Sequence, residues 1–414
     1  MLHRTVLIIG FTWPEPETTA AGNHMVQLLA FFIRYECKVI FASTAGETEH
    51  ALPLEKMGVQ RKVIRVNDPG FDTFVKTIQP AMVLFDRFLT EEQFGWRVAE
   101  HAPSALRILD TEDLHSLRHI REKLLKKHTL FTTREWLQSD MAKREIASIY
   151  RCDLTLVLST YEMELLTHVV GIQKQLLLHV PFLLSKIGEQ QVNEWASFDQ
   201  RNDFICIGNG KHSPNVDALV WLKTDLWPKI RKELPDAKLG IYGAYLPKKV
   251  EAMHDVEDGF LVKGWAKDVG KVMARARVNL APLRFGAGIK GKLVLGMQTG
   301  TPGITTAIGA EGMHEGLPWN GKITDRAEAF ARAAIEMYSN KKAWELAQLR
   351  GQAIVNACYN KDEISKRFVG RIQALLEDLE AHRTQNFMGA MLMHHTMAST
   401  KYLSKYIVEK NKRA

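Results

Sequence analysis

The sequence predicts an α/β protein built from two Rossmann-like, doubly wound parallel-sheet domains. Short apolar runs rich in Val, Ile and Leu alternate with segments of helical periodicity, and this alternation occurs on both sides of a polar stretch at 181–200. Continuous runs of this kind are typical of strands buried on both faces of a parallel sheet. Repeated β-α units imply that helices cover the two faces of each sheet.

Length and composition agree with this prediction. A chain of 414 residues is too long for one core, and 46% hydrophobic with 25% charged residues is ordinary for a globular protein. No apolar run reaches the roughly 18 residues that a membrane span needs. The run Thr5–Gly10 is too short for an export signal and continues into Trp13 and Pro14, so we expect a first strand and a cytoplasmic protein.

The order of the runs gives the domain organisation. We expect an N-terminal domain at 1–185, a second domain at 201–383, and a methionine-rich helix at 384–414 that packs back on the first domain. The strands expected in the first domain are 5–10, 38–43, 62–66, 81–86, 105–110, 154–159 and 174–180. Those expected in the second are 203–208, 238–243, 259–264, 278–283, 302–306 and 321–324.

Charge and cysteine content narrow the choice of partners. The net charge of +8 and the pI of about 9.1 favour anionic partners. No arginine-rich run is interleaved with aromatic residues, so we expect no nucleic-acid partner. The cysteines lie far apart and none forms a metal-type pair, which indicates reduced, buried thiols and no metal site.

The segment 278–312 carries the clearest chemical signal. A strand ends at Leu283, and the following loop contains three glycines and three cations before a helix begins. Glycines allow close approach of the backbone to a ligand, and a helix N-terminus offers free N–H groups to an anion. We therefore expect a diphosphate site formed by Arg284, Gly286, Gly288, Lys290, Gly291 and Lys292.

The same glycines allow another interpretation. Gly286, Gly288 and Gly291 match the G-x-G-x-x-G pattern of dinucleotide sites, and Glu311 lies where a ribose-binding acid could follow. Lysines within the loop suit a terminal diphosphate better than the internal pyrophosphate of a dinucleotide. A dehydrogenase is therefore the weaker alternative.

The run PLRFGAGIKGK, followed by GTPGITTAIGAEGM, closely resembles the donor-binding stretch of glycosyltransferase family 4, the group 1 glycosyltransferases. The resemblance is continuous from about 204 to 313 and is looser in the first half. It implies the GT-B fold and transfer of a sugar from a nucleoside diphosphate sugar to a hydroxyl acceptor. It also implies retention of anomeric configuration, no metal and no cofactor besides the donor.

The resemblance assigns roles to individual residues. Arg284, Lys290 and Lys292 would neutralise the diphosphate, with Lys211 as a further phosphate partner and Gly22 facing it from the first domain. The family usually has a glutamate on the ribose where this chain has Leu295, and Glu311 is the residue that could compensate. The expected donor-binding set is completed by Gly286, Gly288, Gly291 and Thr306.

The acceptor side is expected after the strand that ends near residue 110. Asp110, Asp113 and His115 follow that strand and would face the cleft, although Asp113 could simply cap the next helix. The resemblance places a histidine near the transferred sugar, so His115 is the candidate catalytic residue. Weaker candidates at other strand ends are Asp86, Arg87, Ser159 and Glu162.

The helix expected at 114–128 is basic and amphipathic, so peripheral contact with an anionic membrane is an open alternative to packing on its own domain. Enzymes that resemble this chain often act on polysaccharide or lipid-linked glycan acceptors. Two other functions also stay open: a non-catalytic nucleotide-sugar-binding homologue or partner subunit, and a sugar-nucleotide epimerase of the same fold.

Overall fold

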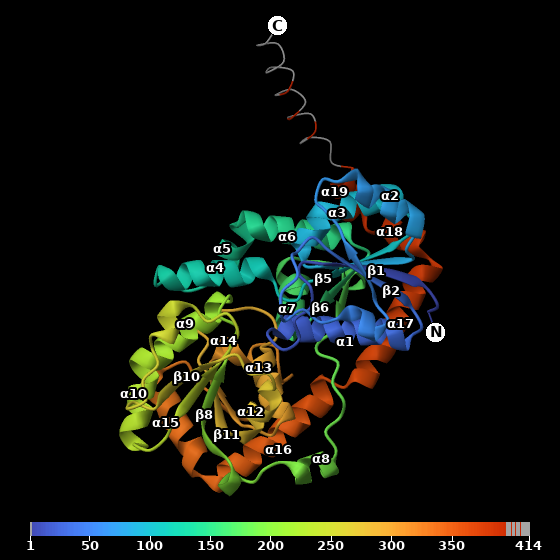
Figure 1. The fold of residues 1–414 in the computed structure, drawn as a ribbon. Helices are drawn as coiled ribbons and strands as arrows, with labels where there is room; N and C mark the ends of the chain where they lie inside the picture. The colour runs from blue at the N-terminus through green and yellow to red at the C-terminus, as the bar shows by residue number, and fades with distance from the viewer. Residues whose placement is uncertain (1, 395–398, 400–401, 403–405, 407–414) are drawn as a thin grey trace.

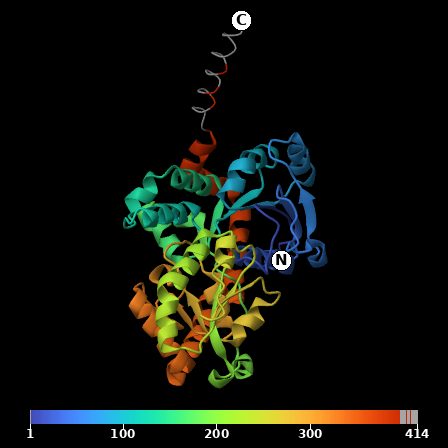
Figure 2. The ribbon, with the colours of Figure 1, turned by 60° about the vertical axis from the view of Figure 1, so that its left-hand side comes forward.

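The computed structural model describes residues 2–394 together with residues 399, 402 and 406. This part of the chain forms two α/β domains, each built on a parallel sheet, which lie one above the other (Figure 1). Figure 2 shows the same stacking of the two domains from a second direction. The predicted fold class is confirmed.

The first domain contains a sheet with the strand order β3-β2-β1-β4-β5-β6-β7. Its strands are β1 (Thr5–Gly10), β2 (Lys38–Ser43), β3 (Gln60–Val63), β4 (Met82–Asp86), β5 (Leu106–Asp110), β6 (Leu154–Val157) and β7 (Leu177–His179). Its helices are α1 (Ala20–Arg34), α2 (Pro69–Ile78), α3 (Phe88–His101), α4 (His115–Lys126), α5 (Thr133–Gln138), α6 (Asp140–Arg151) and α7 (Thr160–Glu164). Short helical turns occur at η1 (Leu54–Met57), η2 (Leu165–Val169) and η3 (Lys174–Leu176).

Both faces of this sheet are buried, as continuous apolar strands require. In β1, Leu7 and Ile9 pack in the core on the side of α2 to α6, whereas Val6 and Ile8 pack on the side of α1. The strand expected at 62–66 lies earlier, as β3. Because β3 is an edge strand with mostly exposed side chains, its apolar signal comes from Ile64, which is buried just after the strand.

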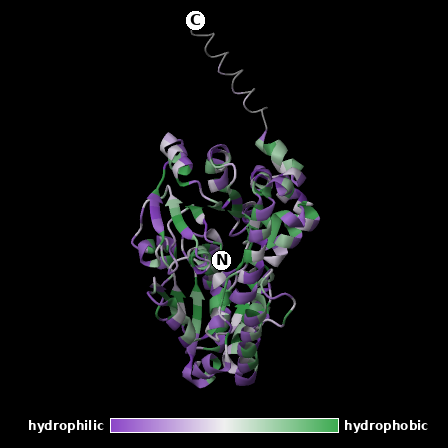
Figure 3. Cartoon of the chain, turned by 90° about the vertical axis from the view of Figure 1, so that its right-hand side faces the viewer, coloured by the Kyte–Doolittle hydropathy of each residue, from purple (hydrophilic) through white to green (hydrophobic). Residues whose placement is uncertain are grey.

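The second domain contains a sheet with the order β10-β9-β8-β11-β12-β13. Its strands are β8 (Asn202–Ile207), β9 (Leu239–Tyr242), β10 (Phe260–Gly264), β11 (Ala276–Ala281), β12 (Gly303–Thr305) and β13 (Gly321–Ile323). Its helices are α9 (Ser213–Trp221), η5 (Leu222–Leu226), α10 (Trp227–Glu233), α11 (Lys248–Glu251), α12 (Val269–Arg275), α13 (Gly291–Gln298), α14 (Ala307–Ala310), α15 (Ala327–Ser339) and α16 (Lys341–Cys358). Figure 3 shows hydrophobic strands inside both domains and many hydrophilic stretches on the outer helices.

Two chain segments cross between the domains. The linker contains α8 (Glu189–Glu194) and η4 (Phe198–Gln200), and its Leu184 pairs with the returning chain. The Leu184 N–H donates to the Tyr359 carbonyl, and the Lys361 N–H donates to the Leu184 carbonyl, each at 2.8 Å. The return then continues as α17 (Lys361–Glu377), α18 (Leu379–Gln385) and α19 (Phe387–Met393).

The return to the first domain begins at α17, earlier than the expected boundary at 384. Phe368 of α17 stacks on Phe31 of α1 with ring centroids 4.5 Å apart, and Ile364 and Ile372 join the same core. The apolar face of α17 is visible in the sequence, but periodicity does not say which domain will cover it. Apart from residues 399, 402 and 406, the predicted tail helix beyond His394 lies outside the described residues.

All cysteines are described, free and buried: Cys37, Cys152, Cys206 and Cys358. The expectation of reduced, buried thiols is therefore met in the structure. None of the helices in the described part of the chain has the length and apolar character that a membrane span requires.

Candidate active site

A cleft of about 600 Å³ lies between the two domains at the carboxyl ends of their strands. The first domain contributes the loop after β1, and the second contributes the loops after β8 and β11. The strand order of each sheet reverses at this point, between β1 and β4 in the first sheet and between β8 and β11 in the second. Such switch points are where open α/β sheets bind ligands.

Two helix N-termini meet in this cleft. A Cβ added to Gly291, the first residue of α13, would lie 2.6 Å from the Cβ of Ala20, the first residue of α1. Thr19 caps α1 by accepting a hydrogen bond from the Gly22 N–H at 2.9 Å, and a Cβ on Gly22 would lie 2.5 Å from the Glu15 backbone. The partial positive charges of both helices therefore face the same space, which suits an anion.

Lys290 and Lys292 lie at the start of α13 and line the cleft. The Lys290 ammonium donates to the Gly288 carbonyl at 2.8 Å, and the Lys292 ammonium donates to Asn215 Oδ1 at 2.5 Å. Burial lowers the pKa of Lys292 to about 8. Burial also lowers the pKa of Lys290, against the opposing attraction of Glu311 and Glu162. Both ammonium groups are partly desolvated, so a ligand with negative charge would stabilise them.

The glycine loop before α13 is held by the first domain. Gly286 has φ 154° and Gly288 has φ 65°, values that favour glycine. The Gly288 N–H donates to Glu162 Oε1 at 2.7 Å, and Arg121 donates to the Gly286 carbonyl at 2.8 Å. Arg121 also forms two hydrogen bonds with Glu311, at 2.7 and 2.8 Å. The shape of this loop therefore depends on contact between the domains.

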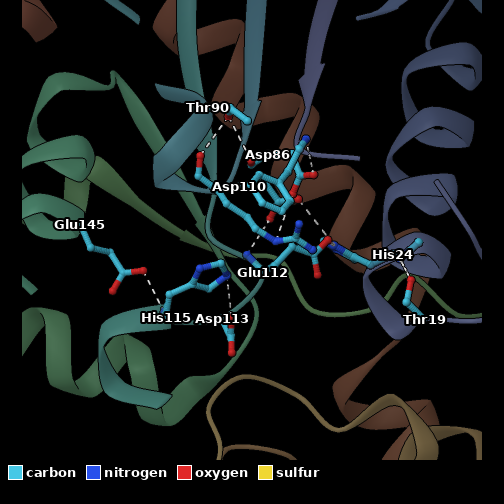
Figure 4. A network of polar contacts seen from close by, with 12 residues as sticks. Thr19, His24, Asp86, Thr90, Asp110, Glu112, Asp113, His115 and Glu145 are labelled. Atoms are coloured by element: carbon cyan, nitrogen blue, oxygen red, sulfur yellow. Dashed lines mark hydrogen bonds and ion pairs between the residues drawn. The ribbon is translucent and has the colours of Figure 1, made fainter. Parts of the chain in front are cut away.

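An acidic group lies at the strand ends of the first domain, beside the cleft (Figure 4). His24 Nδ1 is 3.2 Å from Glu112 Oε1 and 3.7 Å from Asp110 Oδ2. Burial, with the nearby charge of Glu112, raises the pKa of Asp110 to about 8, and burial also raises the pKa of Glu112 well above its usual value. One ligand atom from each of the three residues lies within 4.8 Å of the others, and within the described part of the chain Asp110 Oδ2 and His24 Nε2 have no hydrogen-bond partner.

Two residues at these strand ends have a strained, left-handed backbone conformation. Glu112 has φ 57° and Arg87, after β4, has φ 72°, and both line the cleft. Non-glycine residues adopt such angles at a cost of about 1–3 kcal/mol, and they concentrate at functional sites.

His115 begins α4 and faces the cleft. Its Nε2 is 3.1 Å from Asp113 Oδ1, and its backbone N–H donates to Glu145 Oε1 at 2.9 Å (Figure 4). Burial raises the pKa of Asp113, but ion pairs with Arg118 and His115 outweigh it and hold that pKa well below its usual range. An ionised Asp113 therefore orients the imidazole of His115 at the cleft wall.

The structure brings most of the predicted site residues to one wall or the other. Those that line the cleft are Gly22, Asp113, His115, Lys211, Gly286, Gly288, Lys290, Gly291 and Lys292. Lys211 is exposed and lies with its ammonium 3.5 Å from the ring centroid of Tyr245.

Four residues of the predicted donor and acceptor sets lie elsewhere, as do the weaker candidates Ser159 and Glu162. Arg284 points to α9 and forms two hydrogen bonds with Asp217, at 2.8 and 2.5 Å. Thr306 caps α14 and donates to the Leu283 carbonyl at 2.5 Å, and Glu311 is held by Arg121. Asp110 is buried behind the cleft wall. Arg284, Thr306 and Glu311 each contact a residue from a distant part of the sequence, and residue spacing does not reveal that partner.

Arg121 and His24 are site residues that the sequence did not single out. Arg121 stood among the cations of a basic helix, and His24 stood inside the apolar pattern of α1. Of the cations on the basic helix, Arg118 and Arg121 pair with Asp113 and Glu311, whereas Lys123, Lys126 and Lys127 are exposed, with Lys126 pairing with Glu122 one turn earlier. The sequence does not distinguish the paired arginines from the exposed lysines, because their difference lies in tertiary contacts.

Comparison with known proteins identifies the second domain. No curated protein sequence matches the chain. Residues 201–340 match the family model described as "Glycosyl transferases group 1". These residues form a group 1 glycosyltransferase domain. The match spans β8 to α15 and includes Lys290, Lys292 and the glycine loop.

Solved GT-B glycosyltransferase structures share the architecture of the whole chain. HepE from Anabaena, in complex with UDP and glucose, is 12% identical with a TM-score of 0.67, covering 90% of this chain and 100% of its own. Sucrose-phosphate synthase from Thermosynechococcus elongatus is 14% identical with a TM-score of 0.64, covering 90% and 99%. A glycosyltransferase from Rickettsia africae is 11% identical with a TM-score of 0.63, covering 91% and 100%. The group 1 domain thus sits in a chain with the GT-B fold.

Proposed function

We propose that the protein transfers a sugar from a nucleoside diphosphate sugar to a hydroxyl acceptor, with retention and without a metal ion. The observation that carries this proposal is that two helix N-termini meet in the cleft beside the buried Lys290 and the partly buried Lys292. A diphosphate leaving group gains negative charge as the glycosidic bond breaks. Donors fixed in advance around that charge are typically the largest contribution to catalysis.

The first domain would receive the acceptor. Glu112, Asp113 and His115 line that side of the cleft, so they can accept hydrogen bonds from sugar hydroxyls. We place His115 beside the transferred sugar, in the orientation that Asp113 gives it. The acceptor in this proposal is a glycan or a lipid-linked glycan of polysaccharide biosynthesis.

Peripheral contact with an anionic membrane is part of this proposal for a lipid-linked acceptor. Lys123, Lys126 and Lys127 are exposed at the end of α4, and Leu130 beside them is 88% exposed. This combination suits the surface of an anionic bilayer. Sedimentation with vesicles that contain phosphatidylglycerol should carry the protein down, and replacing the three lysines with glutamine should release it.

Thermal unfolding with UDP, GDP, ADP, CDP and TDP tests the donor site. A ligand at 100 times its Kd stabilises the protein by about 2.7 kcal/mol. One of these nucleotides should raise the Tm of the wild type, and the Lys290→Ala, Lys292→Ala double variant should lose that shift. Lys232 and Lys342 are exposed on outer helices, so their double alanine variant is the matched control and should keep the shift. A shift with NAD alone would favour the dehydrogenase alternative.

Product analysis separates the remaining functions. A transferase forms a glycoside only when an acceptor is present, whereas an epimerase converts the donor without one. A non-catalytic homologue binds the nucleotide sugar and leaves it unchanged. Leu295 and the engaged Glu311 are the observations that keep the non-catalytic alternative open.

A further inference from the structure

The cleft continues beyond the two lysines along the second domain. Its wall there is formed by Leu295 of α13, Ile207 at the end of β8 and Tyr242 at the end of β9. These three side chains pack on one small apolar cluster around Ile205 and Met273. This part of the wall is therefore fixed and apolar.

Leu295 lies at the depth where a nucleoside would follow the diphosphate. It is four residues after Gly291, which corresponds to about 6 Å along the helix axis. With the phosphates at the N-terminus of α13, the pentose comes next along this helix. Leu295 thus presents methyl groups where the pentose would lie.

No carboxylate is available on this wall. Among the described residues of the second domain that line the cleft, none is Asp or Glu. The acids that line the cleft all belong to the first domain: Glu15, Glu17, Asp86, Glu112 and Asp113. The nearby Glu311 is held by Arg121. Nucleotide sites typically hold the 2′-hydroxyl of ribose with an Asp or Glu, and this cleft offers none at that depth.

We propose that the donor of this protein is a 2′-deoxyribonucleoside diphosphate sugar, an inference that rests on the proposed function. A 2′-hydroxyl against Leu295 would lose hydrogen bonds to water and gain none from the methyl groups that face it, which disfavours ribose. A deoxyribose places C–H groups there instead. Gln298, one turn later on α13, also lines the cleft, and its amide suits the single 3′-hydroxyl that remains.

Matched nucleotide pairs test this inference. We would measure Kd by calorimetry for UDP and dUDP, GDP and dGDP, ADP and dADP, and CDP and dCDP. In the pair with the preferred base, the deoxy member should bind about tenfold more tightly. Comparing dUDP with TDP then tells whether the base carries a methyl group.

Substitution of Leu295 gives the second half of the test. Leu295→Glu supplies the missing carboxylate and should reverse the preference, with the ribonucleotide about tenfold tighter. Leu295→Gln, which is neutral, should remove most of the deoxy preference and serves if the charged variant does not fold. Leu295→Ala adds space without an acceptor and should keep the deoxy preference. Thermal unfolding without ligand shows which variants are folded.

The outcomes separate this inference from the proposed function. Equal or tighter binding of the ribonucleotide by the wild type would overturn the inference and leave the proposed function standing. Folded glutamate and glutamine variants with an unchanged preference would overturn it too. If no nucleoside diphosphate of either kind binds, the proposed function fails and the inference fails with it.

Discussion

At the scale of single residues, burial sets the charge state of the cleft. Lys292 is partly buried and donates to Asn215, and its pKa is lowered to about 8, whereas Asp110 is buried beside Glu112, and its pKa is raised to about 8. At neutral pH the Asp110 carboxyl is therefore mostly protonated and neutral, whereas Lys292 keeps most of its charge and loses it as the pH rises through about 8. The lowered pKa of Lys292 predicts a pH dependence of ligand binding, and the raised pKa of Asp110 predicts a pH dependence of stability.

Nucleoside diphosphate binding should weaken as the pH rises through about 8. A bound diphosphate favours the charged form of Lys292, so binding takes up a proton once the free lysine has lost it. From pH 7 to pH 9 the Kd should rise about tenfold for this one lysine. The Lys292→Arg variant, whose guanidinium keeps its proton, should show a flatter profile. A Kd that falls with pH would contradict this role of Lys292.

Asp110→Asn should stabilise the protein at pH 8. The carboxyl group titrates near 3.8 in the unfolded chain and at about 8 in the folded protein, so rising pH through this window favours unfolding. The Tm of the variant should exceed that of the wild type by several degrees at pH 8, and the gap should shrink towards pH 4. In contrast, Asp153 is buried, yet Arg383 and Arg107 keep its pKa low, so Asp153→Asn should lower the Tm at pH 8. A Tm difference between Asp110→Asn and the wild type that grows as the pH falls would contradict the raised pKa of Asp110.

At the scale of elements, α1 and α13 meet end to end with no side chain between their first residues. Gly291 begins α13 directly opposite Ala20 of α1, and Phe182 of the linker lies 3.5 Å from the position of a Cβ on Gly291. The contact allows both helix dipoles to act on one ligand. Glycine is required here by space, because Gly291 has no left-handed φ.

Gly291→Ala should weaken nucleotide binding by pushing the two helix ends apart. The added methyl would lie 2.6 Å from the Ala20 Cβ, so a backbone has to move. We expect a loss of about tenfold or more in affinity, since misplacement by about 1 Å is costly in such sites. Gly370→Ala in α17 is the matched control, because a Cβ there meets no atom within 4 Å. Calorimetry with the preferred nucleotide measures both, and equal affinities would contradict the close contact.

At the scale of the whole molecule, the first domain shapes the glycine loop of the second. Arg121 and Glu162 extend from α4 and α7 to the backbone of Gly286 and Gly288, and Arg121 also pairs with Glu311. The return helix α17 fixes the second domain to the first from the other side. If the proposed function holds, the same residues couple domain contact to donor binding.

Arg121→Met should loosen the domains and weaken nucleotide binding together. Removing one partner of a buried ion pair costs about 3–5 kcal/mol, and here that cost falls on the contact between domains. Small-angle X-ray scattering should show a larger radius of gyration, and calorimetry should show a higher Kd. Arg144→Met is the matched control, because Arg144 and Glu92 form a bidentate pair within the first domain. A variant with unchanged radius and unchanged affinity would contradict the coupling.

The sequence by itself determined the two sheets and the loop for which we propose an anion site. Buried parallel strands read as continuous apolar runs, and glycines with lysines before a helix point to an anion, because both signals are local. It could not determine which of those cations reach the cleft. Lys290 and Lys292 do, whereas Arg284 turns to Asp217, 67 residues away in the sequence.

Only the tertiary structure decided how the two halves combine. In the folded chain Ala20 lies opposite Gly291, and Glu311 forms an ion pair with Arg121. Leu295 lies on the cleft wall of the second domain, where no described lining residue is Asp or Glu. It also assigned α17 to the first domain. The physical reason is the same in each case. These contacts join residues far apart in the chain. Which side chains meet depends on their distance and burial in the folded protein, which local sequence patterns do not contain.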